Sequence, residues 1–467
     1  TAVDAARATR EDDVTDLTTW LPRAVEAVAR WEESFGSFPR HPSLHVDDER
    51  LADAFDALSA RLTDNYPFFH PHYVGQMLKP PHPAAVLGYV TAMLINPNNH
   101  ALDGGPATAA MEKDVVARLA TMFGMPRHLG HLTSSGTIAN LEALFVAREC
   151  HPGKAVAFSA DAHYTHARMC HVLGVEAVSI PTDELGRMDL AALDAELSAG
   201  RIGTVVATLG TTGLGAVDPL DRIVPLAREH GVRVHVDTAY GGFFSLIADG
   251  TEDGVVREPF EAIRQADSVV VDPHKHGLQP YGCGAVLFAD PSVGRFYGHD
   301  SPYTYFSSDE LHLGEISLEC SRAGASAAAL WLTLEVLPLT ADGLGAALRP
   351  GRRGALAWHR LLHESHALVP YQPPELDIVT YLPDRATMTA VDAASQSVFR
   401  AAGQGDPRDQ VHVATYAVTG GHLDARGHAI AHDADHARIL RSVVMKPESE
   451  PAIPSVHARL EELASQA

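Results

Sequence analysis

The chain has 467 residues, of which 46% are hydrophobic, and its formal net charge is −23. This length suits one large α/β domain with smaller appendages. The acidic charge disfavours nucleic acid and anionic membranes as partners, because both are negatively charged. Four cysteines without a CxxC pair fit a reducing cytoplasm, and no apolar stretch reaches the roughly 20 residues that span a bilayer. The first residues lack an apolar signal-peptide core, so we expect a cytoplasmic protein.

Residues 1–84 are predicted to form an N-terminal helical arm. Within ERLADAFDALSARL, Leu51, Phe55, Leu58 and Leu62 recur every three or four residues, as on one face of a helix. The Pro-rich stretch NYPFFHPHYVGQMLKPPHP follows and is typical of an extended arm.

Residues 85–335 are predicted to form a large α/β domain, because apolar runs alternate with helical patterns. Such runs predict a mostly parallel central sheet covered by helices, whose ligands bind at the carboxyl ends of the strands. The predicted strands are AVAFS (155–159), AVSIP (177–181), TVVATLG (204–210), VRVHVD (232–237), SVVVD (268–272) and GAVLFA (284–289).

Residues 336–467 are predicted to form a small C-terminal α+β domain. LDIVTYLP and DQVHVATYAVTG are typical of strands, and ADHARILRSVV and the C-terminal segment are interpreted as helices.

Two side chains follow predicted strands directly. Lys275, in VVVDPHKHG, is nucleophilic toward an aldehyde if it is held away from water, although a lysine there is more often a solvated loop residue. Asp237, in HVDTAYGG, requires a cationic partner if buried, and a protonated pyridine nitrogen is one. The alternatives for Asp237 are a turn cap or a metal ligand. Ala239 is small enough to lie flat against a ring.

Other segments offer a site for an anion and a second ring contact. TSSGTIAN opens a helix at Ser135, Gly136 and Thr137, where free N–H groups suit a phosphate, although an ordinary helix cap is the alternative. His163 follows the strand AVAFS and can stack on an aromatic ring. Its neighbours His166 and His171 fit no zinc pattern, so no metal site is predicted.

Together these residues supply an imine lysine, a pyridinium partner, a stacking histidine and a phosphate cradle. This combination predicts the cofactor pyridoxal 5′-phosphate (PLP).

The segments HVDTAYGG and DPHKHG, which lie about 38 residues apart in the chain, carry a resemblance to a known family. Over roughly residues 65–450 the chain resembles the group II PLP-dependent amino-acid decarboxylases, which have the aspartate-aminotransferase-like type I fold. The resemblance implies decarboxylation of an L-amino-acid substrate and a homodimer with active sites at its interface. It also implies catalytic roles for Lys275, Asp237, His163 and a loop tyrosine.

The resemblance places further residues at the cofactor and the substrate. Thr208 and Thr211, in ATLGTT, and His274 and Asp272, next to the lysine, are expected at the cofactor. His100, Lys79 and Arg322 are expected on the substrate side, Arg322 with a structural or a carboxylate-binding role. Many family members carry Glu where Ile138 stands, and some carry Asn in place of Asp272. The loop acid is assigned to Tyr305, with Tyr303 and His312 as alternatives.

The substrate is left open between two classes. DPHKHGLQPYGCGAVLF resembles tyrosine-decarboxylase-type members and favours an aromatic amino acid. An acidic substrate needs an unpaired Lys or Arg, for which Lys79 is the candidate. An oxidative aldehyde-forming enzyme, a carbon–carbon lyase and an aminotransferase of the same fold are the alternative activities.

Overall fold

A computed structural model describes residues 16–298 and 311–467. Its largest element is a seven-stranded sheet with the order β1-β7-β6-β5-β4-β2-β3. All neighbouring strands pair in parallel except at β7, which is antiparallel to both β1 and β6. The mostly parallel sheet predicted from the sequence is therefore confirmed. The strands are β1 (Leu129–Thr133), β2 (Ala155–Ser159), β3 (Ala177–Ile180), β4 (Ile202–Thr208), β5 (Arg233–Thr238), β6 (Ser268–Val271) and β7 (Gly284–Phe288).

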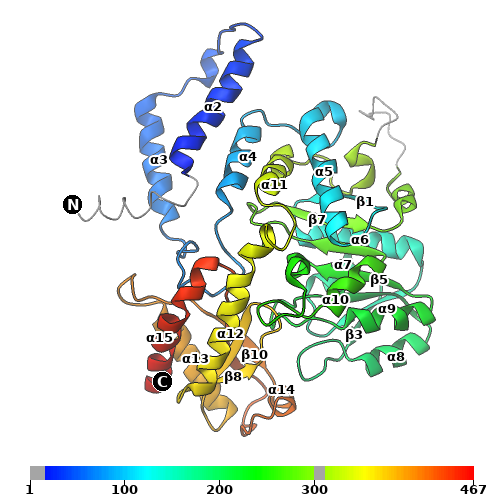
Figure 1. Cartoon of the computed structure of the whole chain (residues 1–467), viewed down its shortest axis with the longest axis vertical. Helices are drawn as coiled ribbons and strands as arrows, with labels where there is room; N and C mark the ends of the chain where they lie inside the picture. Colours follow the sequence, from blue (N-terminus) through cyan, green and yellow to red (C-terminus); the bar gives the residue numbers. More distant parts are fainter. Residues whose placement is uncertain (1–15, 299–310) are drawn as a thin grey trace.

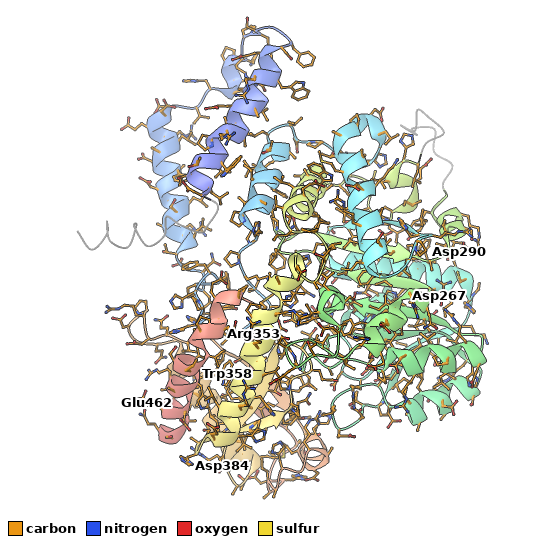
Figure 2. All side chains as sticks on the ribbon, viewed as in Figure 1. Asp267, Asp290, Arg353, Trp358, Asp384 and Glu462 are labelled. Carbon is orange, nitrogen blue, oxygen red and sulfur yellow. The ribbon has the colours of Figure 1, made fainter. Side chains whose placement is uncertain are left out.

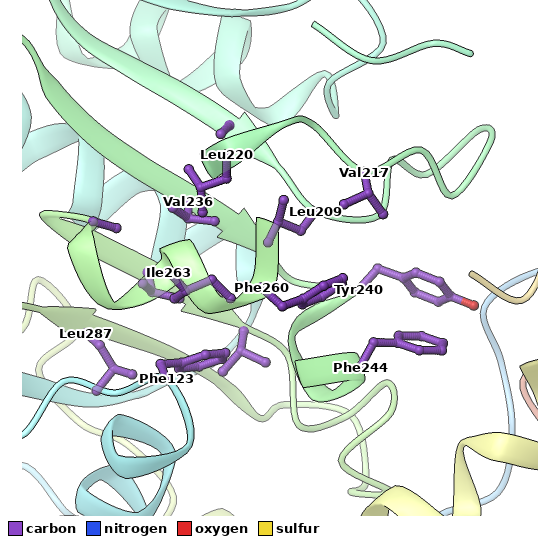
Figure 3. Close-up of a cluster of buried hydrophobic side chains, with 14 of the residues drawn as sticks. Phe123, Leu209, Val217, Leu220, Val236, Tyr240, Phe244, Phe260, Ile263 and Leu287 are labelled. Carbon is purple, nitrogen blue, oxygen red and sulfur yellow. The ribbon is translucent and has the colours of Figure 1, made fainter. Parts of the chain in front are cut away.

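Both faces of this sheet are buried. Val269 and Val271 pack into one apolar cluster, whereas the intervening Val270 packs into a second one on the opposite face, as the alternation of a strand requires. Figure 3 shows the first cluster, in which Phe260 and Ile263 lie beside Val236 of β5. The covering helices are α5 (Pro106–Met122), α6 (Gly136–Cys150), α7 (Thr165–Leu173), α8 (Leu190–Ser198), α9 (Leu220–Glu229) and α10 (Glu258–Glu261).

A second, antiparallel sheet of four strands forms the C-terminal part, in the order β10-β11-β9-β8. Trp358, labelled in Figure 2, is fully buried against Tyr381 at a ring distance of 5.3 Å. The elements are α12 (Arg349–Glu364), β8 (Leu368–Gln372), β9 (Ile378–Pro383), α13 (Met388–Ala402), β10 (Ala414–Val418), α14 (Gly420–Ala425), β11 (Ala437–Val443) and α15 (Ile453–Gln466).

The helix predicted in ADHARILRSVV is wrong, because this segment is the strand β11. β11 pairs with β9 on one side and β10 on the other. All of its residues except Arg438 are buried, and the adjacent Ile439 and Leu440 pack into different apolar clusters, as expected for a central strand covered on both faces.

The N-terminal helices α2 (Leu17–Glu33) and α3 (Asp48–Leu62) stand apart from both sheets in Figure 1. The following helix, α4 (Pro83–Met93), packs against α11 (Gly324–Val336) and connects this arm to the large domain. The helical character predicted for the arm is thus present, while the domain boundaries at residues 84 and 335 stay a proposal. No helix in the two described ranges combines the length and hydrophobicity needed to cross a membrane.

Candidate active site

A cavity of about 250 Å³ lies beside the carboxyl ends of β4, β5 and β6 and the first turn of α6. The predicted catalytic residues Lys275, Asp237 and His163 all line it. Every predicted cofactor-binding residue except Thr211 also lines it. These residues are Ser135, Gly136, Thr137, His163, Thr208, Asp237, Ala239, Asp272, His274 and Lys275.

Asp237 lies at the end of β5 and is 4% exposed. Its Oδ2 atom is 2.9 Å from Nε2 of His166, and its Oδ1 accepts the Ala239 N–H at 3.0 Å. Burial raises the pKa of this carboxyl, but the hydrogen bonds from His166 and Ala239 outweigh it and hold the pKa well below its usual range. Asp237 is therefore ionised and suited to pair with a protonated ring nitrogen.

His163 follows β2 and is held through one ring nitrogen. The Thr165 N–H donates to Nδ1 at 3.2 Å, and the Thr165 hydroxyl lies 2.8 Å from the same atom. Burial lowers the pKa of His163, so the imidazole is neutral and carries its proton on Nε2. The ring therefore offers an N–H donor rather than a positive charge.

Lys275 lies in the turn after β6 and is partly exposed to the cavity. Its Nζ atom is 3.1 Å from Oδ2 of Asp272, and its side chain is 19% exposed. A lysine in this setting is reachable by a small aldehyde and has a carboxylate counterion beside it.

The first turn of α6 forms a site suited to an anion. Ser135 caps the helix by accepting the Ile138 N–H at 3.3 Å. The N–H groups of Gly136 and Thr137 have no acceptor among the described residues, as is usual at a helix start. These free N–H groups and the positive end of the helix dipole favour a phosphate.

The two threonines of ATLGTT have different roles. Thr208 Oγ1 is buried at the cavity and has no hydrogen-bond partner in the described part of the chain. Thr211 is fully buried, and its Oγ1 accepts the Ala216 N–H at 3.0 Å within the turn after β4. Thr208 is therefore the one of the two that is placed to contact a cofactor.

None of the predicted substrate residues Lys79, His100 and Arg322 lines the cavity. The guanidinium of Arg322 is 2.5 Å from Glu112 Oε1 and 2.6 Å from the Leu132 carbonyl oxygen, which favours its structural role. Lys79 donates to the Met445 carbonyl at 3.2 Å. His100 Nδ1 lies 3.1 Å from the Cys320 carbonyl oxygen. Tyr305 and Tyr303 lie outside the described residues.

Several lining residues were not predicted. They are Asn140, Tyr164, Thr165, Gly210, Thr212 and Tyr240. Tyr164 and Thr165 lie within the same DAHYTHARM segment as His163, so that segment was the available signal. His166 was considered only as a metal-like residue, and its contact with Asp237 crosses 71 positions of the chain. No cluster of three metal-ligating side chains occurs in residues 16–298 and 311–467.

A single carboxylate of the C-terminal part holds two neighbours of the key residues. Tyr240, next to Ala239, donates its hydroxyl to Asp377 Oδ1 at 2.5 Å. His276, next to Lys275, has its Nε2 atom 3.2 Å from Asp377 Oδ2. The two structural parts therefore meet directly beside the cavity.

These observations fit PLP on three independent points. Asp237 is ionised for the ring nitrogen, α6 presents free N–H groups for the phosphate, and the orphaned Thr208 hydroxyl offers a further contact. Lys275 supplies the amine that an aldehyde requires.

Comparison with known proteins agrees with this geometry. The family model of the pyridoxal-dependent decarboxylase conserved domain matches residues 68–349. The chain is 29% identical to an L-tyrosine decarboxylase of Enterococcus faecium, over 77% of each chain. It is 33% identical to a probable L-aspartate decarboxylase of Halobacterium salinarum, over 55% of this chain and 71% of that protein.

A solved structure confirms the fold. The crystal structure of Oryza sativa TDC with PLP and tryptamine superposes with a TM-score of 0.76 and 20% sequence identity, covering 98% of this chain and 99% of that one. The family match spans more than half of the chain and includes the cavity residues. The chain therefore belongs to the pyridoxal-dependent decarboxylase family and is a PLP-dependent amino-acid decarboxylase.

Proposed function

We propose that the enzyme converts an aromatic, tyrosine-like L-amino acid to its amine and CO2. The observation that carries this choice is the charge of the cavity wall. Among the described lining residues, Lys275 is the only lysine or arginine, and it is needed for the cofactor. A substrate with an anionic side chain therefore lacks a free cation there, whereas an aromatic side chain needs none. The relationship to an L-tyrosine decarboxylase supports the same choice.

The cavity residues have separate roles in this proposal. Lys275 holds the cofactor aldehyde, and Asp237 keeps the ring nitrogen protonated. Ala239 packs against one ring face and His163 against the other. Ser135, Gly136 and Thr137 hold the phosphate, and His274 lines the cavity next to Lys275. When bound, PLP supplies the electron sink that accepts the bonding electrons as the carboxylate leaves as CO2.

His163 is placed to orient the departing carboxylate. Its neutral ring has Nδ1 occupied by Thr165, so Nε2–H is the available donor. A neutral donor binds the carboxylate of the ground state more weakly than a cation does, and it therefore opposes loss of CO2 less. The return of a proton to Cα is proposed to involve His163 or Tyr305.

The acidic alternative depends on Lys79. Burial lowers the pKa of Lys79 to about 8, although Asp377 and Glu448 oppose this effect. Lys79 donates a hydrogen bond to the Met445 carbonyl oxygen, and within the described residues it forms no ion pair with a carboxylate. If the enzyme is specific for aspartate, replacing Lys79 with Met will abolish activity, whereas an aromatic substrate will tolerate the change.

The enzyme is also proposed to act as a homodimer. The apolar face of α3, composed of Leu51, Phe55, Leu58 and Leu62, is more than half exposed at every position. A regular apolar helix face of this kind is unfavourable in water and is typical of a subunit interface. The arm that carries it is the segment proposed to pack against the partner.

A panel of L-amino acids tests the substrate proposal. Protein loaded with PLP is incubated with tyrosine, tryptophan, phenylalanine, aspartate, glutamate and 2,4-diaminobutyrate, and CO2 and the amine are both quantified. The proposal expects the highest kcat/KM for an aromatic member. A preference for aspartate or glutamate would contradict it, while leaving the decarboxylase assignment intact.

A further inference from the structure

Asp272 introduces a carboxylate at the place proposed for the cofactor phosphate. It directly follows β6, is 3% exposed and lines the cavity. A Cβ atom added to Gly136 would lie 2.5 Å and 2.6 Å from its two oxygens. The carboxylate thus rests against the first residue of α6, whose free N–H groups form the anion site.

One oxygen of Asp272 is satisfied and the other is not. Oδ2 lies 3.1 Å from Lys275 Nζ. Oδ1 is buried and has no hydrogen-bond partner in the described part of the chain. An orphaned carboxylate oxygen is costly when buried, so this atom is expected to have a partner in the functional state.

The surrounding titratable groups do not supply that partner. His274 Nδ1 donates to the Cys283 carbonyl at 2.7 Å, and burial lowers the pKa of His274, so its Nε2 atom, 3.5 Å from Oδ2, carries a lone pair. Burial raises the pKa values of Tyr281 and Cys283, and it lowers that of His163, so all three are neutral. Within the described ranges, Lys275 is the one cation that faces the carboxylate, and it lies on the Oδ2 side.

We propose that Asp272 and the phosphate of PLP share one proton, which lies between Oδ1 and a phosphate oxygen. This inference rests on the placement of the phosphate at α6 proposed above. A phosphate monoester carries a charge of about −1.5 to −2 at pH 7, and two anions in contact in a buried site cannot both stay fully ionised. The shared proton comes from solvent on binding, and it converts a repulsion into a charge-assisted O–H···O hydrogen bond.

The shared proton makes the affinity for PLP depend on pH, and this dependence requires the phosphate group of the cofactor. Above the second pKa of a phosphate monoester, near 6, binding must take up about one proton, and Kd rises about tenfold per pH unit. Asparagine at position 272 donates an N–H to the dianion and needs no proton. Pyridoxal lacks the phosphate but reacts with the same lysine. The pH dependence of its Kd therefore measures the effect of pH on Lys275 without the contribution of the phosphate.

The test measures the ratio of the Kd values for PLP and pyridoxal between pH 6.5 and 9, from visible absorbance, in the wild type and in Asp272→Asn. A change in the reactivity of Lys275 caused by the substitution alters both Kd values equally, so it does not affect their ratio. The proposal expects the ratio to rise about tenfold per pH unit in the wild type and to stay flat in the variant. Asp161→Asn, which removes a partly buried carboxylate that does not line the cavity, should keep the wild-type slope. Equal slopes in wild type and Asp272→Asn would overturn the proposal.

A second measurement needs no variant. Calorimetric titration of the wild type at pH 8, in two buffers with different ionisation enthalpies, counts the protons taken up on binding. The expected result is about one proton more for PLP than for pyridoxal. Equal proton uptake would overturn the shared proton while PLP binding itself stands. If neither aldehyde bound, the placement of the cofactor would fail as well.

Discussion

His166 and Asp237 form a buried pair in which Nε2 lies 2.9 Å from Oδ2, and the His166 side chain is fully buried. The pair connects α7 to the end of β5, where Asp237 lines the cavity. Burial raises the pKa of Asp237, and His166 is the largest of the groups that oppose this effect, ahead of the Ala239 N–H. His166 therefore acts on the cofactor through Asp237, as a positioning residue.

Replacing His166 with Leu is expected to raise the pKa of Asp237 and to lower kcat by the order of 10–100-fold, as is usual for the loss of a residue that supports a key ligand. His166→Gln keeps an N–H donor and should restore much of the activity. The pH profile of kcat and the visible spectrum of the PLP-loaded protein measure the effect. His171→Leu, on the exposed side of the same helix, is the matched control. Equal losses in both leucine variants would refute the role of His166.

Thr208 and Thr211 offer a matched pair of substitutions. Thr208→Val should weaken PLP binding roughly tenfold, the effect of one hydrogen bond of about 1–1.5 kcal/mol, without lowering the stability of the cofactor-free protein. Thr211→Val should do the opposite, because it removes the hydrogen bond to Ala216 and leaves the cavity unchanged. Spectroscopic titration and urea unfolding distinguish the two. Weaker PLP binding in Thr211→Val alone would reverse the assignment.

The buried carboxyl of Glu375 should make the free energy of unfolding depend on pH. Burial raises its pKa to about 7, although the Val217 N–H and Arg187 oppose this effect. Its ordinary value is 4.5, so between these pH values the folded protein holds a proton that the unfolded chain has lost, and stability falls as pH rises. Between pH 5 and 8 the free energy of unfolding should fall by roughly 2 kcal/mol more in the wild type than in Glu375→Gln. Urea titrations at both pH values test this, with the exposed Glu229→Gln as control. Parallel profiles for wild type and Glu375→Gln would show that this carboxyl is not responsible.

The exposed apolar face of α3 is proposed to stabilise the dimer, which a substitution on that face can test. Leu58→Asp puts a charge on the exposed apolar face of α3 and should convert a dimer to a monomer with greatly reduced turnover, because the active site is proposed to lie at the interface. Asp56→Asn, a polar change on the same helix, should leave the dimer unchanged. Light scattering combined with activity of each species gives the answer, and a fully active monomer is the result that the proposal forbids.

The sequence predicted the residues whose positions depend on strand ends. Asp237 and Lys275 follow apolar runs long enough to be recognised as buried strands, and parallel strands bring their carboxyl ends to one edge. β1 was not predicted, because LGHLT is short, contains a glycine and a histidine, and among the described strands pairs only with β7.

Residues whose roles depend on tertiary contacts were not predictable in this way. The resemblance left Arg322 with a structural or a carboxylate-binding role, and its contact with Glu112, which lies 210 positions earlier in the chain, favours the structural one. Thr208 and Thr211 are only three positions apart in one motif, and only the turn after β4 decides which of them faces the cavity. The local sequence pattern indicates neither the contact between Arg322 and Glu112 nor which of the two threonines faces the cavity.

The most direct test of the central claim is the stoichiometry of CO2 and amine formed from L-tyrosine by the PLP-loaded wild type and by Lys275→Ala. The account predicts equal amounts of CO2 and tyramine from the wild type. It predicts loss of both products and of the visible absorbance of the lysine-bound cofactor in the variant, with its far-ultraviolet circular dichroism unchanged. Undiminished CO2 release by Lys275→Ala would contradict the account.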